Sequence, residues 1–63
     1  MEEQDWYFTF GSSQIHAGCY TIIHGTEESA RQEMMRRYGP RWSMQYKSAE
    51  DAGVERWKLR KIQ

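Results

Sequence analysis

Thr26-Glu-Glu-Ser-Ala-Arg-Gln-Glu-Met-Met-Arg-Arg-Tyr-Gly-Pro40 decides the fold, because this stretch carries both the start and the stop signals of one amphipathic helix. Thr26 is a preferred N-cap residue, and the glutamates and arginines in the first and last turns complement the helix dipole. Gly39 and Pro40 end the helix. A stripe at helical spacing is predicted to face a sheet: Ala30, Met34 and Tyr38, with Met35 beside them.

Two strands are predicted before this helix. Residues 6–10 alternate, which places Trp6, Phe8 and Phe10 on one face. Residues 19–24 are rich in β-branched side chains and carry apolar residues on both faces. This second strand is therefore expected to be central or covered on both sides.

Two more strands are predicted after the helix, over residues 42–47 and 54–62, because both segments alternate. Between them, residues 48–51 resemble a capping box, which predicts a single helical turn that ends at Gly53. The side chains expected to point inward from these two strands are Trp42, Met44, Tyr46, Trp57 and Leu59.

The resulting order is β-β-α-β-β, so we expect a small α+β domain: a four-stranded antiparallel sheet, in the order 2-1-3-4, with one helix packed on one face. Residues 1–63 form one domain, in which residues 1–4 are expected to be a flexible acidic N-terminus. The opposite face of the sheet is predicted to be uncovered and to carry Tyr7, Thr9, Thr21, Ile23, Ser43, Gln45, Lys47, Arg56, Lys58 and Arg60.

Length and composition point to a small cytoplasmic protein. A chain of 63 residues builds one thin core, so self-association as a homodimer is expected. Cys19 is the single cysteine, which excludes an internal disulfide, and no apolar signal segment or membrane-spanning run is present. Residues 1–30 carry a charge of −5 and residues 31–63 a charge of +5. This split suits a charged partner or a second copy head to tail, unless the two halves interleave in space.

The connection over residues 11–18 is longer than the two to five residues that usually join two strands. Its glycines could suggest a phosphate cradle, but a strand and not a helix N-terminus follows it. Gln14 and His16 can both donate and accept hydrogen bonds, and with Tyr20 they are candidate partner-binding residues.

Catalytic and metal-binding sites are weakly indicated. His16, Cys19 and His24 include too few cysteines for a structural zinc site, and alternation separates the last two. Ser12 or Ser13 with His16 and Asp5 has no nucleophile-elbow or oxyanion-hole motif beside it. The sequence therefore predicts no enzyme, no cofactor and no metal.

Basic side chains at alternate positions of the last strand, Arg56, Lys58 and Arg60, are the second set of candidate partner-binding residues. With Lys47, Arg41 and Tyr7 they suggest a platform for nucleic acid. A solvated edge strand would look the same, and the acidic N-terminal half opposes phosphate binding.

A longer pattern within residues 6–46 resembles small proteins encoded by phages and prophages. It consists of Phe8-Thr-Phe-Gly-Ser-Ser-Gln14, His16-Ala-Gly18, Tyr20, Ala30-Arg31, Met34, Tyr38-Gly39, Trp42 and Gln45-Tyr46, with Ser13 where a glycine is expected. The resemblance implies a phage-encoded accessory protein that inhibits a host anti-phage defence protein by direct stoichiometric binding. A small nucleic-acid-binding module is the alternative.

Overall fold

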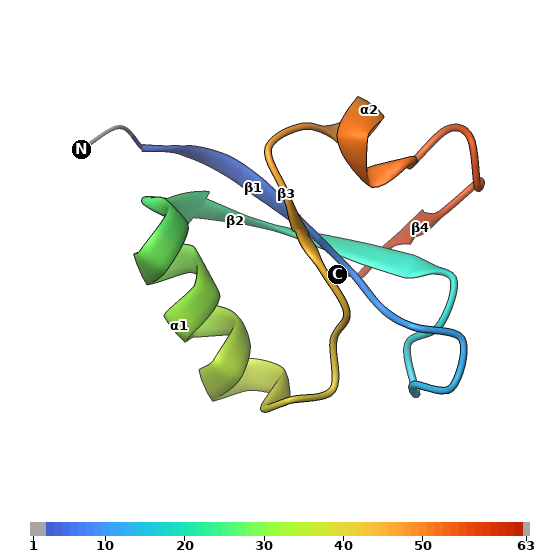
Figure 1. Ribbon diagram of the computed structural model, residues 1–63, viewed down its shortest axis with the longest axis horizontal. Helices are drawn as coiled ribbons and strands as arrows, with labels where there is room; N and C mark the ends of the chain where they lie inside the picture. Colours follow the sequence, from blue (N-terminus) through green and yellow to red (C-terminus); the bar gives the residue numbers. More distant parts are fainter. Residues whose placement is uncertain (1–2, 63) are drawn as a thin grey trace.

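The computed structural model describes residues 3–62 and confirms a small α+β domain (Figure 1). Of the predicted flexible tail, residues 1 and 2 lie outside the described part, and Gln4 already belongs to a strand. The elements along the chain are β1 (Gln4–Thr9), β2 (Cys19–Gly25), α1 (Glu27–Tyr38), β3 (Gln45–Tyr46), α2 (Ala49–Ala52) and β4 (Arg60–Lys61).

The β1–β2 hairpin forms the sheet side of the hydrophobic core. Its register places Trp6 opposite Ile23 and Phe8 opposite Thr21, and directly opposed residues share a face. Thr21 and Ile23 are therefore buried on the core side, which corrects their predicted place on the uncovered face. The error arose because both faces of this strand carry apolar residues, so its alternation does not say which face is buried.

Helix α1 has the predicted bounds and caps. The Thr26 hydroxyl accepts a hydrogen bond from Ser29 N, and the Ser29 hydroxyl accepts one from Thr26 N in return. Ala30 and Met34 are fully buried against the hairpin. Met35 is 50% exposed, so it does not belong to the buried stripe beside which it was predicted.

One exposed ion-pair cluster lies on the last turns of α1. The Glu33 carboxylate accepts hydrogen bonds from Arg36 and Arg37, and these bonds lower its pKa from 4.5 to about 2. Because the pKa is lowered in the folded state, the cluster stabilises the fold above about pH 4.5 and ceases to do so as the pH falls toward 2.

We expect Glu33→Gln to reduce the loss of stability between about pH 5 and pH 2. Glutamine is uncharged and does not titrate, so no ion pair with the arginines is lost when the pH falls. The effect should be small for a pair at the surface. Urea unfolding at several pH values measures it. The double variant Arg36→Gln with Arg37→Gln should flatten the same range, and an unchanged pH dependence in both would contradict the prediction.

The sheet is mixed and its order is β3-β1-β2-β4, which corrects the all-antiparallel order 2-1-3-4. The first strand does lie between the second and third, as predicted, and both of those pairs are antiparallel. Strand β4 instead pairs in parallel with β2, where Cys19 is opposite Arg60. The third and fourth strands are also shorter than predicted, with two residues each.

The physical reason for the different order lies in residues 53–59, which fold into tight turns and not into a strand. Trp57 N donates to Gly53 O and Leu59 N to Val54 O, and Lys58 has a left-handed φ of 52°. Helix α2, with the predicted Ser48 N-cap and Gly53 at its end, begins this reversal. The chain therefore crosses from the β3 edge of the sheet to the β2 edge.

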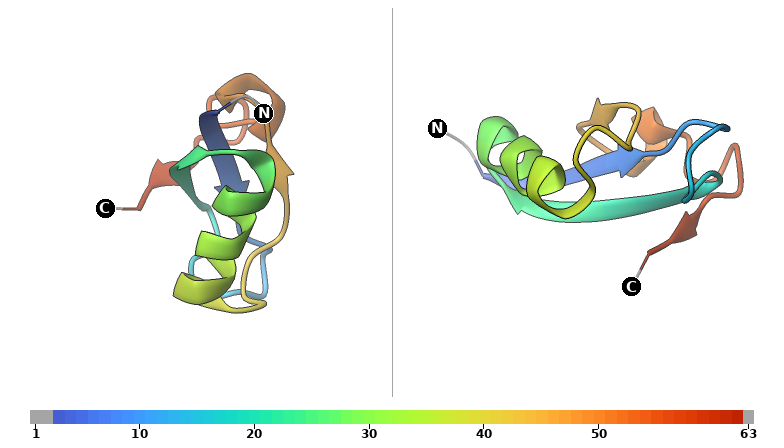
Figure 2. Two further views of the ribbon diagram at one scale, coloured as in Figure 1. Left: turned by 90° about the vertical axis from the view of Figure 1, so that its left-hand side faces the viewer. Right: turned by 90° about the horizontal axis from the view of Figure 1, so that it is seen from below.

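The crossing also covers part of the face that was predicted to be open. Helices α1 and α2 lie on opposite sides of the β1–β2 pair (Figures 1 and 2). Ala52 of α2 is buried but lies outside the core cluster beneath α1. On the α2 side of the sheet, Tyr7 stacks on Tyr20 with ring centroids 6.1 Å apart. The domain therefore has a main core under α1 and a smaller layer under α2.

Candidate functional site

The long loop over residues 11–18 is held by its own hydrogen bonds. The backbone N–H groups of Gln14, Ala17 and Cys19 donate to the carbonyl oxygens of Gly11, Gln14 and His16. The Gln14 side-chain oxygen also accepts a hydrogen bond from Gly11 N. Gln14, a candidate partner-binding residue, thus uses its amide oxygen to close the loop.

His16 lies in an aromatic cluster that fastens this loop to the end of α1. Its ring is 5.3 Å from Phe10 and 5.5 Å from Tyr38, and Phe10 and Tyr38 are 5.2 Å apart, all edge to face. The side chain is partly buried. His16 therefore has a packing role whether or not it also contacts a partner.

We expect His16→Ala to destabilise the domain by about 1–3 kcal/mol, because two edge-to-face contacts are lost, each worth about 0.5–1.5 kcal/mol. The free energy of unfolding from urea titration checks this. Ser12→Ala is the control, since Ser12 is exposed on the same loop. Equal stability of the two variants would show that the aromatic cluster does not hold the loop.

Tyr20 is not brought together with Gln14 and His16. Residues alternate across β2, so Tyr20 lies on the α2 side with Tyr7, whereas His16 contacts the Phe10 ring of the core cluster. His16 and Tyr20 thus lie toward different faces of the sheet.

The predicted basic row does not form a strand face. Arg56 and Lys58 lie in the turns before β4, and Arg60 belongs to β4. All three are exposed. Tyr7 is partly buried on the α2 side, and Lys47 lies near the start of β1, where its carbonyl oxygen accepts a bond from Gln4. The expected flat platform is therefore replaced by a basic turn at one edge.

Trp57 is the most exposed aromatic feature of this turn and was wrongly predicted to point inward. It is 69% exposed, although it belongs to a residue type with a large apolar surface. The Arg56 guanidinium lies 5.7 Å from its ring centroid. A Cβ on Gly53 would come within 2.4 Å of Trp57 Cδ1, so the indole rests directly on the glycine backbone. We call Arg56, Trp57 and Lys58 the Trp57 turn.

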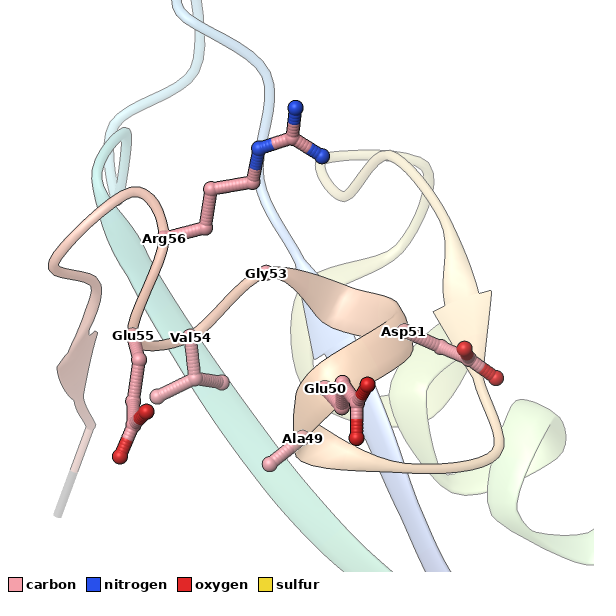
Figure 3. A pocket seen from close by; sticks show the side chains of 7 residues that line it. All are labelled: Ala49, Glu50, Asp51, Gly53, Val54, Glu55 and Arg56. Carbon is pink, nitrogen blue, oxygen red and sulfur yellow. The ribbon is translucent and has the colours of Figure 1, made fainter.

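A hollow lies beside the Trp57 turn, lined by α2 and the residues that follow it (Figure 3). Ala49 and Val54 supply its apolar part. Arg56 points away from the carboxylates of Glu50 and Glu55, which extend toward the opposite side (Figure 3). The segment thus offers cationic and aromatic groups on one side and carboxylates on the other.

Part of the charge asymmetry of the sequence persists at the two ends of the β1–β2 hairpin, although Lys47 of the basic half lies near the acidic end. Glu3 and Asp5 flank His24, with 2.9 Å between Asp5 Oδ1 and His24 Nδ1. This end of the hairpin leads into the first turn of α1, which contains Glu27 and Glu28. Arg60 and Lys61 pair with the start of β2, at the other end. The domain therefore presents an acidic end and a basic edge.

The structure does not bring together the residues of the zinc site or of the catalytic triad that were considered from the sequence. Cys19 and His24 lie on opposite faces of β2, and Asp5 contacts His24 and not His16. Within residues 3–62, no group of three or more His, Cys, Asp or Glu side chains is placed to hold a metal ion. The helices in this part of the chain are too short to cross a membrane.

Comparison of the chain with family models, with curated proteins and with solved structures gives no match.

Proposed function

We propose that this protein is a phage-encoded accessory protein that inhibits a host bacterial anti-phage defence protein by direct stoichiometric binding. The resemblance of the sequence pattern to small phage and prophage proteins supports a viral origin, and the host cytoplasm is the proposed location. The proposed mode of action is occlusion: the protein covers a surface of its target, with no catalysis, cofactor or metal.

The exposure of Trp57 is the observation that carries the proposal. A tryptophan that is 69% exposed leaves a large apolar surface in water. Its position is fixed by contact with Gly53 and by the turn that precedes β4, so little conformational freedom is lost when a partner covers it. Tryptophan and arginine are the residue types that most often dominate protein interfaces, and here they are neighbours.

Nucleic-acid binding is the second candidate, because an exposed indole among Arg56, Lys58 and Arg60 could stack on a base while the cations contact phosphates. Two observations favour a protein target instead. Arg56 already lies over the Trp57 ring, and the carboxylates of Glu50 and Glu55 belong to the same segment. These carboxylates repel a phosphate backbone.

We also propose a homodimer, because a 63-residue chain has a thin core and complementary charged ends. Sedimentation at tens of micromolar tests this directly. The mass of two chains is expected, and the mass of one chain would refute the dimer without affecting the proposed inhibition.

Expression in bacteria that carry individual defence systems tests the function. We expect the protein to restore plaque formation by a sensitive phage against one such system. The purified protein should then form a complex of fixed stoichiometry with a protein of that system and inhibit it. If the protein restored plaque formation against none of the defence systems, the proposal would be overturned. Salt-sensitive binding to single-stranded DNA or RNA, without a protein complex, would favour the second candidate.

A further inference from the structure

A second surface lies between the long loop and the end of α1. It is a depression of about 510 Å³ lined by Ile15, His16, Arg37, Tyr38, Pro40 and Arg41, together with the Gly39 backbone. We call it the loop–helix depression. The loop–helix depression and the Trp57 turn have no residue in common.

The walls of the loop–helix depression are fixed before any partner arrives. The edge-to-face contacts of His16 with Phe10 and Tyr38 join the loop to the helix. The hydrogen bonds within residues 11–18 hold the loop, and Arg41 N donates to Tyr38 O at 3.1 Å on the other wall. A preorganised surface loses little entropy on binding.

The loop–helix depression is cationic. Arg37 and Arg41 both line it, whereas no carboxylate of the described residues does. Arg37 also belongs to the ion-pair cluster on α1. There the Glu33 carboxylate accepts hydrogen bonds from Arg36 and from Arg37 Nε. The terminal nitrogens of Arg37 and the whole Arg41 guanidinium make no hydrogen bond among the described residues. Arg36, Arg37 and Arg41 against Glu33 leave a net charge of 3 − 1 = +2 in and beside the depression. This exceeds the partial negative charge of about one half at the helix C-terminus.

An apolar side chain stands beside these cations. Ile15 is 77% exposed at the tip of the loop, and the Pro40 ring is exposed on the opposite wall. The loop that carries Ile15 is held by its own hydrogen bonds. A ligand side chain can therefore pack on this exposed apolar side chain. The chemistry of the loop–helix depression is therefore a carboxylate-binding pair next to an aliphatic contact.

We propose that the loop–helix depression binds an acidic peptide segment of a partner protein, with a carboxylate on Arg37 and Arg41 and an adjacent aliphatic side chain on Ile15. This inference rests on the proposed function and deepens it, because it states the chemistry of part of the target. The Trp57 turn then supplies an aromatic anchor, and the depression selects an acidic segment.

NMR titration of the isotope-labelled protein tests the proposal with a defined probe, an acetylated and amidated hexapeptide of alternating glutamate and leucine. We expect saturable shifts at Ile15, Arg37 and Arg41, and no such shifts with the lysine–leucine counterpart. Arg41→Glu and Ile15→Ser should each weaken binding about tenfold or more, because one reverses a contacting charge and the other removes the apolar contact. Inorganic phosphate should not reproduce the shifts.

Lys47→Glu is the matched control, since it makes the same change of charge at an exposed residue outside the depression and the Trp57 turn, and it should leave the peptide affinity unchanged. Equal weakening by Arg41→Glu and Lys47→Glu would overturn the proposal, because it would indicate unspecific charge attraction. Equal binding of phosphate or of the basic peptide would overturn it as well. The titration needs no host protein, so a failure of the plaque assay with intact peptide binding would refute only the proposed function.

Discussion

Phe8→Ala is expected to remove a large part of the free energy of unfolding at 25 °C. Phe8 of β1 is 0% exposed, and its ring centroid lies 5.2 Å from that of Trp42, edge to face. Truncation of a buried phenylalanine costs about 3–5 kcal/mol. A domain of 63 residues has a total stability of about 3–9 kcal/mol. The loss is therefore at least about a third of the stability, and all of it if the stability lies at the low end of this range.

Far-UV circular dichroism with urea titration measures this effect, and it avoids the fluorescence of Trp42, which the substitution itself would change. Ile15→Ala is the control, because it also removes a large apolar side chain, but one that is 77% exposed. Its free energy of unfolding should stay within about 0.5 kcal/mol of the unsubstituted protein. A cooperative transition of Phe8→Ala at the original urea midpoint would show that the core is not built around Phe8.

The elements that the sequence predicted well are those whose signals are local. Thr26 and Gly39 cap α1 within one turn of each end, and Ser48 and Gly53 do the same for α2. The alternation of Trp6 and Phe8 likewise predicted the buried face of β1. Each signal depends on residues only a few positions apart, so no knowledge of distant contacts is needed.

The position of the last strand could not be predicted in the same way. Residues 54–62 alternate as a strand does, yet only Arg60–Lys61 pair with β2. The left-handed backbone at Lys58 breaks the extended segment, and lysine gives no sequence signal for that conformation. Pairing with β2 and not β3 is decided by contacts between residues about forty positions apart. Local alternation does not contain this information.

The length of the connection between β1 and β2 could be predicted from the sequence, but its packing could not. The unusual length of the loop over residues 11–18 marked it correctly as a distinct feature, but the packing of His16 on Phe10 and Tyr38 depends on tertiary contacts. Trp57 was missed because alternation assigned it to the core. Gly53, four residues earlier, was the available signal: it can end a helix in a left-handed conformation and start a turn.

Trp57→Ala is expected to weaken target binding and inhibition strongly while the fold stays intact. A tryptophan anchor contributes about 2–4 kcal/mol at an interface, which corresponds to a rise of about 30- to 1,000-fold in Kd. The free energy of unfolding should change little, because most of the indole already lies in water. Titration of the purified target with the variant measures Kd, and restoration of plaques measures the consequence in cells.

Met44→Ala separates a specific anchor from general surface hydrophobicity, because Met44 is also a large apolar residue and is 53% exposed outside the Trp57 turn. Its Kd should stay near that of the unsubstituted protein. Trp57→Phe should retain part of the affinity, since phenylalanine keeps an aromatic surface but loses area and the indole N–H. If Trp57→Ala bound the target as tightly as Met44→Ala, the Trp57 turn would not be the anchor. Inhibition would then have to depend on another surface of the domain.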